Sequence, residues 1–225
     1  LVATSFAKTS DIPALGSYSA TSLIKAIKNK KTSATELLKY FIDRHKRLDP
    51  IINAVVTTDF EGALKRAQKA DEALSRGETW GPLHGLPMTI KDNIEVAGML
   101  TTYGFSYFKN YRPTKNADVV QSLLDAGAII FGKTNLPALG KDTQSFNDVF
   151  GQTNNPWDIE KTPGGSSGGS AAALAAGLTG LEIGNDIGGS IRLPTHFCGV
   201  YGHKPSYNIV SMHGGKKPWK KKQSN

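Results

Sequence analysis

The sequence has little cysteine and no long apolar run, and each shortage excludes a class of protein. It contains one cysteine in 225 residues, Cys198, so neither an internal disulfide nor a metal site built from several cysteines can form. No stretch is long and apolar enough to cross a membrane as a helix. The segment Leu1–Ser10 lacks the profile of a signal peptide, which favours a cytoplasmic protein.

Histidine is also scarce, which bears on metal chemistry. The chain has five histidines. His45 falls on the apolar stripe of an expected helix, so we interpret it as a packed helix residue rather than a ligand. The others show no metal-ligand spacing with one another or with Cys198, and we expect no metal and no cofactor. These residues are His84, His196, His203 and His213.

Positive charge is in excess, but it is concentrated at one end. The net charge is +8, and five lysines between Lys216 and Lys222 leave only about +3 for the rest of the chain. A Lys-rich tail can bind nucleic acid without sequence preference. Since the remaining charge is small, we do not expect nucleic acid to be the main partner of this chain. The 39% hydrophobic content, with 24 glycines and 11 prolines, is typical of a soluble enzyme with many loops.

The first 80 residues favour a layer of helices. Apolar residues recur at helical spacing, and Ser33 with Glu36 fits a capping box at the start of the second helix. Asp49-Pro50 is expected to stop that helix. We expect this layer to pack outside a sheet or to form the interface of a homodimer. The expected elements are helices over residues 19–30, 33–49 and 59–76, with a strand over 53–57.

The middle of the chain indicates a parallel sheet. Pro87–Ile90 and Ala128–Phe131 have the apolar character of buried strands, and Asp118–Ala126 between them has a helical pattern. The order strand, helix, strand predicts a parallel βαβ unit. We therefore expect an α/β fold with a mixed, largely parallel sheet flanked by helices.

One match to a nucleotide-binding motif lies inside this unit. Gly127–Thr134 satisfies the phosphate-binding loop pattern literally. That loop needs small residues in the middle and a helix after it, whereas this segment has Ala-Ile-Ile-Phe followed by Asn135-Leu136-Pro137. We interpret the segment as a buried strand and do not expect it to bind a nucleotide.

The most distinctive stretch runs from Lys161 to Gly199. It holds nine glycines between Gly164 and Gly189, beside the serine pair Ser166-Ser167 and the single Ser190. Glycine at this density lets neighbouring N–H groups converge on one point, which suits an anion or a developing oxyanion. A flexible linker would not contain an Ala-rich helical run followed by a strand-like Leu181–Ile183.

Two chemistries compete for these serines. Gly164–Gly168 fits the G-x-S-x-G elbow of α/β-hydrolases, but that fold needs an acid and a histidine at greater distances than remain after Ser166. The other chemistry uses Lys91, which directly follows an apolar strand. Burial would favour its neutral form, the state that a lysine base needs. An exposed, solvated lysine is the alternative, and the residues alone leave the two open.

Three segments together resemble a known family. They are Gly164-Gly165-Ser166-Ser167-Gly168-Gly169-Ser170, Asp186-Ile187-Gly188-Gly189-Ser190-Ile191-Arg192 and Gly85-Leu86-Pro87-Met88-Thr89-Ile90-Lys91-Asp92-Asn93. In these motifs the chain resembles the amidase signature family over roughly residues 15–210. The resemblance implies a partial domain over 1–210, with a helical layer to residue 80 and a catalytic core over 81–210. Residues 211–225 form a Lys-rich tail without family character.

The resemblance also implies a role for each site residue. Ser190 would be the nucleophile, Ser166 the proton relay after a cis peptide bond with Gly165, and Lys91 the base. The backbone N–H groups of Ile187, Gly188, Gly189 and Ser190 would bind the oxyanion. The supporting residues would be Ser167 and Ser170, with Asp186 and Arg192 bracing the loop.

The function implied is hydrolysis of a small-molecule carboxylic amide through an acyl-serine intermediate. One alternative is the A subunit of a glutamine-dependent glutamyl-tRNA amidotransferase, which would meet nucleic acid only through its complex. Ile187 slightly favours the stand-alone amidases, because the amidotransferase subunits tend to have threonine there. Another alternative is an inactive, truncated fragment with a structural or binding role, since the family normally continues for about as long again.

Overall fold

A computed structural model describes residues 19–215. It contains a four-stranded sheet in the order β1-β3-β2-β6, formed by β1 (Val55–Thr58), β2 (Pro87–Lys91), β3 (Ile129–Thr134) and β6 (Glu182–Ile183). β2 pairs in parallel with both neighbours, while β1 runs antiparallel to β3. The expectation of a mixed, largely parallel sheet is confirmed. The expectations for residues 1–10 and for the lysines from 216 onward lie outside the described residues.

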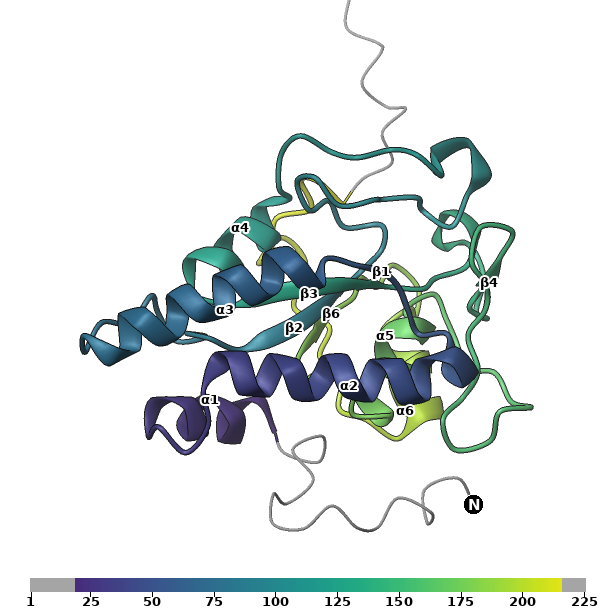
Figure 1. Cartoon of the computed structure of the whole chain (residues 1–225). Helices are drawn as coiled ribbons and strands as arrows, with labels where there is room; N and C mark the ends of the chain where they lie inside the picture. The colour runs from purple at the N-terminus through teal and green to yellow at the C-terminus, as the bar shows by residue number, and fades with distance from the viewer. Residues whose placement is uncertain (1–18, 216–225) are drawn as a thin grey trace, which may run out of the picture.

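Helices flank this sheet (Figure 1). In that view α5 and α6 lie beside the C-terminal half of α2, and α5 contacts all four strands of the sheet. A short second sheet pairs β4 with β5 in antiparallel fashion. The helices are α1 (Ala20–Lys28), α2 (Ala34–Ile52), α3 (Phe60–Ser75), α4 (Asp118–Asp125), α5 (Gly168–Ala175) and α6 (Arg192–Cys198). The remaining elements are β4 (Phe146–Asn147), β5 (Gly151–Gln152) and the 3₁₀ turns η3 (Ser106–Phe108) and η4 (Ala138–Gly140).

Helix α2 begins as expected and ends later than expected. The capping box is present, because Glu36 N–H donates to Ser33 Oγ at 3.0 Å and Ser33 N–H donates to Glu36 Oε2 at 2.8 Å. Pro50, however, lies inside the helix, which continues to Ile52. A proline this close to the C-terminus removes only one late N–H donor. Asn53 ends the helix instead, in a left-handed conformation with φ 55°.

The N-terminal helices pack onto the sheet through one continuous apolar core. Phe41 of α2 stacks on Phe131 of β3 with ring centroids 6.3 Å apart, and both side chains are buried. Alanines of α3 join the same cluster, whose small side chains let the helix approach closely. The expectation that this layer packs outside the sheet is confirmed, while the homodimer stays a prediction.

The parallel βαβ unit is present as β2, α4 and β3. The literal nucleotide motif falls on β3, where residues 128–131 are buried. Its lysine, Lys133, is buried too and donates to the carbonyl oxygen of Ile94 at 2.8 Å and to Thr101 Oγ1 at 3.0 Å. The segment is therefore a strand of the core and has no phosphate-binding loop. Across residues 19–215, no helix has the length and apolar character needed to span a membrane.

Candidate active site

Lys91 is the last residue of β2 and is completely buried. Its Nζ lies 2.7 Å from Ser166 Oγ, 2.9 Å from Ser167 Oγ and 2.8 Å from Asn185 Oδ1. Burial lowers the pKa of Lys91 to about 7, although the negative charges of Asp186 and Glu182 act in the opposite direction. At neutral pH a large share of this amine is therefore uncharged. We call Lys91, Ser166, Ser167 and Asn185 the lysine–serine cluster.

The serine pair is presented by a glycine loop that enters α5. The peptide bond between Gly165 and Ser166 is cis, as the resemblance implied. A Cβ on Gly165 would lie 2.8 Å from the carbonyl carbon of Thr143, which leaves no room for a side chain. A Cβ on Gly169 would collide with the backbone of Asn135, because the first turn of α5 rests on the end of β3. These glycines let the loop lie against the sheet, with Ser166 and Ser167 turned to Lys91.

Ser190 lies on a separate loop between β6 and α6. The Ser167 N–H donates to the Ser190 carbonyl oxygen at 3.0 Å, which joins the two loops through their backbones. Among residues 19–215, no hydrogen bond connects the hydroxyl groups of Ser166 and Ser190. Of the two side-chain links expected from the sequence, the Lys91–Ser166 link is present and the Ser166–Ser190 link is not formed.

Asp186 braces the Ser190 loop, as the resemblance implied. Its carboxylate accepts from Gly189 N–H at 2.7 Å, from Ile191 N–H at 3.0 Å and from the Arg192 guanidinium at 3.0 Å. Although burial opposes ionisation, these hydrogen bonds hold the pKa of Asp186 well below its ordinary value. Asp186 is 1% exposed in its side chain, so the pair with Arg192 is more than a surface ion pair.

The expected set of oxyanion donors needs one correction. The Gly189 N–H donates to Asp186 and is therefore not free to bind a substrate oxygen. Within the described part of the chain, the N–H groups of Ile187, Gly188 and Ser190 donate no hydrogen bond. Ile187 and Gly188 are exposed.

Ser170 belongs to a second polar layer behind the lysine. Its hydroxyl lies 2.9 Å from Thr134 Oγ1, which in turn donates to Glu182 Oε1 at 2.7 Å. The Thr89 hydroxyl donates to the other oxygen of Glu182. Burial raises the pKa of Glu182 to about 7. Ser170 therefore supports Glu182 rather than Lys91 directly.

Two polar groups of this region were not predicted from the sequence. Glu182 is a carboxylate inside an apolar strand, Leu181-Glu182-Ile183, and that mismatch was a usable signal. Asn185 stands next to Asp186 in the recognised motif, but its contact with Lys91 depends on two segments 94 residues apart. Its Nδ2 donates to Asn93 Oδ1 at 3.0 Å, which links it to the segment after Lys91.

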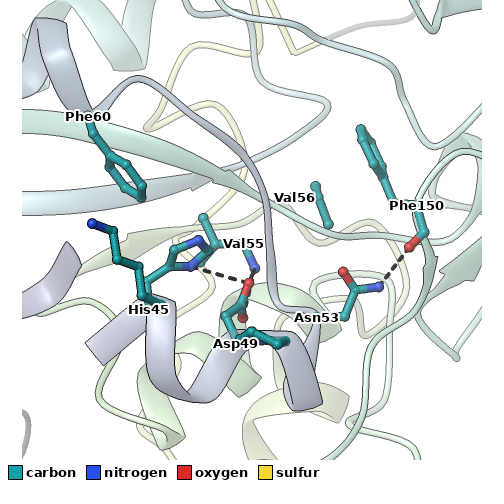
Figure 2. Close-up of a pocket in the computed structure, with 9 residues that line it drawn as sticks. His45, Asp49, Asn53, Val55, Val56, Phe60 and Phe150 are labelled. Carbon is teal, nitrogen blue, oxygen red and sulfur yellow. Dashed lines mark hydrogen bonds and ion pairs between the residues drawn. The ribbon is translucent and has the colours of Figure 1, made fainter. Parts of the chain in front are cut away.

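A separate pocket of about 480 Å³ lies between the C-terminal half of α2, β1 and Phe150 (Figure 2). His45 lies on its wall, 3.3 Å from Asp49, and its ring meets Phe60 edge-on with centroids 5.4 Å apart. His45 is thus a packed helix residue, as expected. None of the residues lining this pocket belongs to the lysine–serine cluster. Over residues 19–215, no group of His, Cys, Asp and Glu is arranged to hold a metal ion.

Comparison with known proteins places the chain in a family. The model of the family described as Amidase matches residues 36–225. The A subunit of the glutamyl-tRNA(Gln) amidotransferase from Carboxydothermus hydrogenoformans is 47% identical over 196 residues, which cover 87% of this chain and 40% of that protein. The corresponding protein from Heliobacterium modesticaldum is 46% identical over 82% of this chain and 38% of its own length. The chain thus spans about two fifths of the length of these relatives.

Solved structures of amide hydrolases have the same fold as this chain. The native peptide amidase of Stenotrophomonas maltophilia superimposes with a TM-score of 0.85 and 36% identity, covering 90% of this chain and 43% of that one. A fatty acid amide hydrolase superimposes with a TM-score of 0.83 and 29% identity, covering 93% of this chain and 37% of that one. Since the family model matches most of the chain and these folds coincide, the chain belongs to the amidase family.

Proposed function

We propose that this chain carries the reactive groups of an amide hydrolase, with Ser190 as nucleophile, Ser166 as proton relay and Lys91 as base. The observation that carries the proposal is the 2.7 Å contact between Lys91 Nζ and Ser166 Oγ, two side chains that are both buried. An amine whose pKa lies near 7 is free to accept a proton at neutral pH. A solvated lysine would stay charged and could not act as a base.

The proposed reaction begins with attack of Ser190 Oγ on the amide carbonyl carbon. The Ser190 proton passes to Ser166 Oγ while the proton of Ser166 passes to Lys91 Nζ. The same relay then returns a proton to the leaving nitrogen, the C–N bond breaks, and ammonia or an amine departs. Water then attacks the acyl carbon and passes a proton through Ser166 to Lys91. The relay returns a proton to Ser190 Oγ as the ester C–O bond breaks, which releases the carboxylic acid and restores the free serine.

This sequence of steps requires the Ser190 hydroxyl to turn toward Ser166. The backbone bond from Ser167 N–H to the Ser190 carbonyl already holds the two loops together at 3.0 Å, so a side-chain rotation is the movement proposed. For the oxyanion we propose the N–H groups of Ile187, Gly188 and Ser190, since Gly189 is engaged by Asp186. Neither a metal nor an organic cofactor takes part in the proposed steps.

Phosphonylation of the nucleophile tests this proposal. The 225-residue chain, and a longer version continued to the length of its relatives, would be incubated with a fluorophosphonate and analysed by intact mass and peptide mapping. We expect one adduct, located on Ser190, and hydrolysis of members of an amide library by the longer version. An adduct on another residue would contradict the assignment. An adduct in the longer version alone would favour the interpretation of the 225-residue chain as an inactive fragment, and no adduct in either version would favour a structural or binding role.

A second candidate is the A subunit of a glutamyl-tRNA(Gln) amidotransferase, a function favoured by the names of relatives at 46–47% identity. In this role the same serine would release ammonia from glutamine and pass it to another protein of the complex. Ile187 favours a stand-alone amidase instead. Glutaminase activity that rises when the other proteins of the complex are added would support the amidotransferase. Amide hydrolysis unaffected by them would support the stand-alone enzyme.

A further inference from the structure

We propose that Asn185 is a positioning residue that fixes the direction of the Lys91 lone pair and aims it at Ser166. This inference rests on the proposed function, because it explains how one serine of the pair becomes the relay. It follows from counting donors and acceptors around the Lys91 amine. Three oxygen atoms surround that nitrogen, and they differ in what they can offer.

Asn185 Oδ1 can only accept a hydrogen bond. Its orientation is fixed from the other side, because Asn185 Nδ2 donates to Asn93 Oδ1 at 3.0 Å. Reversing the amide would set its NH₂ group against the amine and its oxygen against the Asn93 oxygen. One N–H of Lys91 is therefore committed to Asn185 Oδ1 at 2.8 Å.

Ser167 is committed as an acceptor as well. Its hydroxyl proton is donated to the Asn185 main-chain carbonyl at 3.3 Å, so Ser167 Oγ can only accept from Lys91. Asn185 thus engages Lys91 with its side chain and orients Ser167 with its backbone. The two residues together take both N–H donors that a neutral amine has.

Ser166 is the partner that remains. A neutral amine has two donors and one lone pair, and the lone pair then faces Ser166 Oγ at 2.7 Å. Ser166 consequently donates its proton to Lys91 and leaves its own oxygen lone pairs open to the Ser190 proton. This is the direction of transfer that the proposed relay needs, and it singles out Ser166 over the adjacent Ser167.

Two negatively charged groups act on the Lys91 amine. Glu182 of β6 and Asp186 of the following loop both favour the ammonium form. Asp92 follows Lys91 directly and accepts from Thr102, while Lys133 of neighbouring β3 donates toward Ile94 and Thr101. Helix α5, which covers this face, has no titratable side chain. Because these neighbouring charges are the same in all variants, a shift in the Lys91 titration midpoint can be assigned to the change at residue 185.

Two substitutions separate a positioning role from a structural one. Asn185→Asp keeps an acceptor oxygen but adds a negative charge, which favours the ammonium and moves the Lys91 midpoint to higher pH by about one unit or more. Asn185→Leu removes the acceptor that stabilises the ammonium and moves the midpoint to lower pH. The midpoint is read from the ¹³Cε resonance of Lys91 during a pH titration, with assignment by its loss in Lys91→Gln. Asn116→Asp, which adds the same charge shortly before α4, is the control and leaves the midpoint unchanged.

Phosphonylation of Ser190 supplies the second measurement. At the alkaline plateau we expect Asn185→Asp to react within about threefold of wild type and Asn185→Leu to react at least about tenfold more slowly, because its amine is no longer oriented. If Asn185 had only a structural role, both variants would react more slowly and the Lys91 midpoint would be the same in the variants as in wild type. Equal midpoints in all three proteins, or a wild-type plateau in Asn185→Leu, would overturn the inference. Should Asn185→Leu not fold, an unshifted midpoint in Asn185→Asp is sufficient to refute it.

The two proposals fail separately. The Lys91 titration needs no substrate, so opposite shifts in the two variants would support the Asn185 contact even if no fluorophosphonate adduct formed on Ser190. Labelling of Ser190 without any shift would instead support the proposed function and refute the role of Asn185.

Discussion

Glu182 of β6 pairs with Thr89 of β2, two residues before Lys91 on the same strand face. This pairing places a partly buried carboxyl group near the buried amine, where the Thr89 and Thr134 hydroxyls hold it. The Glu182 negative charge raises the pKa of Lys91 against the larger effect of burial. The charge of Glu182 and the burial of Lys91 therefore shift the pKa of Lys91 in opposite directions, and the balance lies at about 7.

Glu182→Gln should consequently shift the pH dependence of Ser190 phosphonylation to lower pH. Without the carboxylate the ammonium form of Lys91 loses a favourable charge, so the amine becomes neutral at lower pH, by about one unit. The rate is measured from about pH 5 to about pH 10, a range that brackets the titration of a lysine with a lowered pKa. Glu160→Gln provides an exposed control with the same change of charge. A profile that moves to higher pH, or moves equally in the control, would contradict the coupling.

Ser190→Ala and Ser166→Ala should reduce fluorophosphonate labelling to different extents. Loss of Ser190 removes the atom that forms the bond, so labelling should disappear completely. Loss of Ser166 removes only the relay, so labelling should slow by roughly 10²- to 10⁴-fold and remain detectable. Intact mass over a time course distinguishes the two. Wild-type labelling of Ser190→Ala would rule out this serine as the nucleophile.

Lys91 should set the alkaline rise of activity. Because its pKa is lowered to about 7, the phosphonylation rate should rise through that pH and reach a plateau in mild alkali. Lys91→Arg should not restore the rate at any pH, since a guanidinium stays charged. The measurement is the rate constant at each pH for both proteins. A fully active Lys91→Arg variant would refute the role of base.

The sequence was most informative where a pattern is local. The capping box at Ser33 and Glu36, the βαβ unit and the strand character of residues 128–131 all depend on neighbours along the chain, and all are confirmed. The predicted end of α2 was wrong by a few residues, because the helix ends at Asn53, which has a left-handed conformation, and not at Pro50.

The candidate site was predictable only in part, for a physical reason. Lys91, Ser166 and Ser167 are named by their motifs, and the fold brings them together. The contact of Asn185 with Lys91 and the placement of Glu182 beside Thr89 depend on strand register between β2 and β6, which no local pattern specifies. The engagement of Gly189 N–H by Asp186 likewise depends on how one turn closes.

Gly165→Ala tests how closely the loop that carries Ser166 packs against the backbone of Asp142 and Thr143. A methyl group there would lie 2.8 Å from the Thr143 carbonyl carbon and 2.9 Å from the Asp142 carbonyl oxygen, so the loop must move. We expect phosphonylation of Ser190 to fall at least about tenfold, since small displacements of reacting groups are costly. Gly215→Ala is a control, because its methyl group would lie 3.7 Å from the Met212 carbonyl oxygen, an ordinary van der Waals contact. Unchanged labelling in Gly165→Ala would show that the loop tolerates a side chain.

Burial of Lys91 should also be visible in stability. Its folded-state pKa of about 7 lies below the ordinary lysine value of 10.5, so the folded chain binds this proton more weakly than the unfolded chain does. The free energy of unfolding of wild type should therefore rise with pH between about 7 and 10.5, with a slope approaching about 1.4 kcal/mol per pH unit from this group alone. Lys91→Met removes the group, so the variant should gain stability relative to wild type as pH falls toward about 7, and the difference should level off below it. Urea unfolding of both proteins from about pH 6 to about pH 10 measures this difference, in which the titrations of groups that do not interact with Lys91 cancel. Glu182 does interact with Lys91 and has a pKa of about 7, so the difference is read above that pH. A difference that is constant across this range would mean that Lys91 binds its proton equally well in the folded and unfolded chains, and the amine could then not be the neutral base that the mechanism requires.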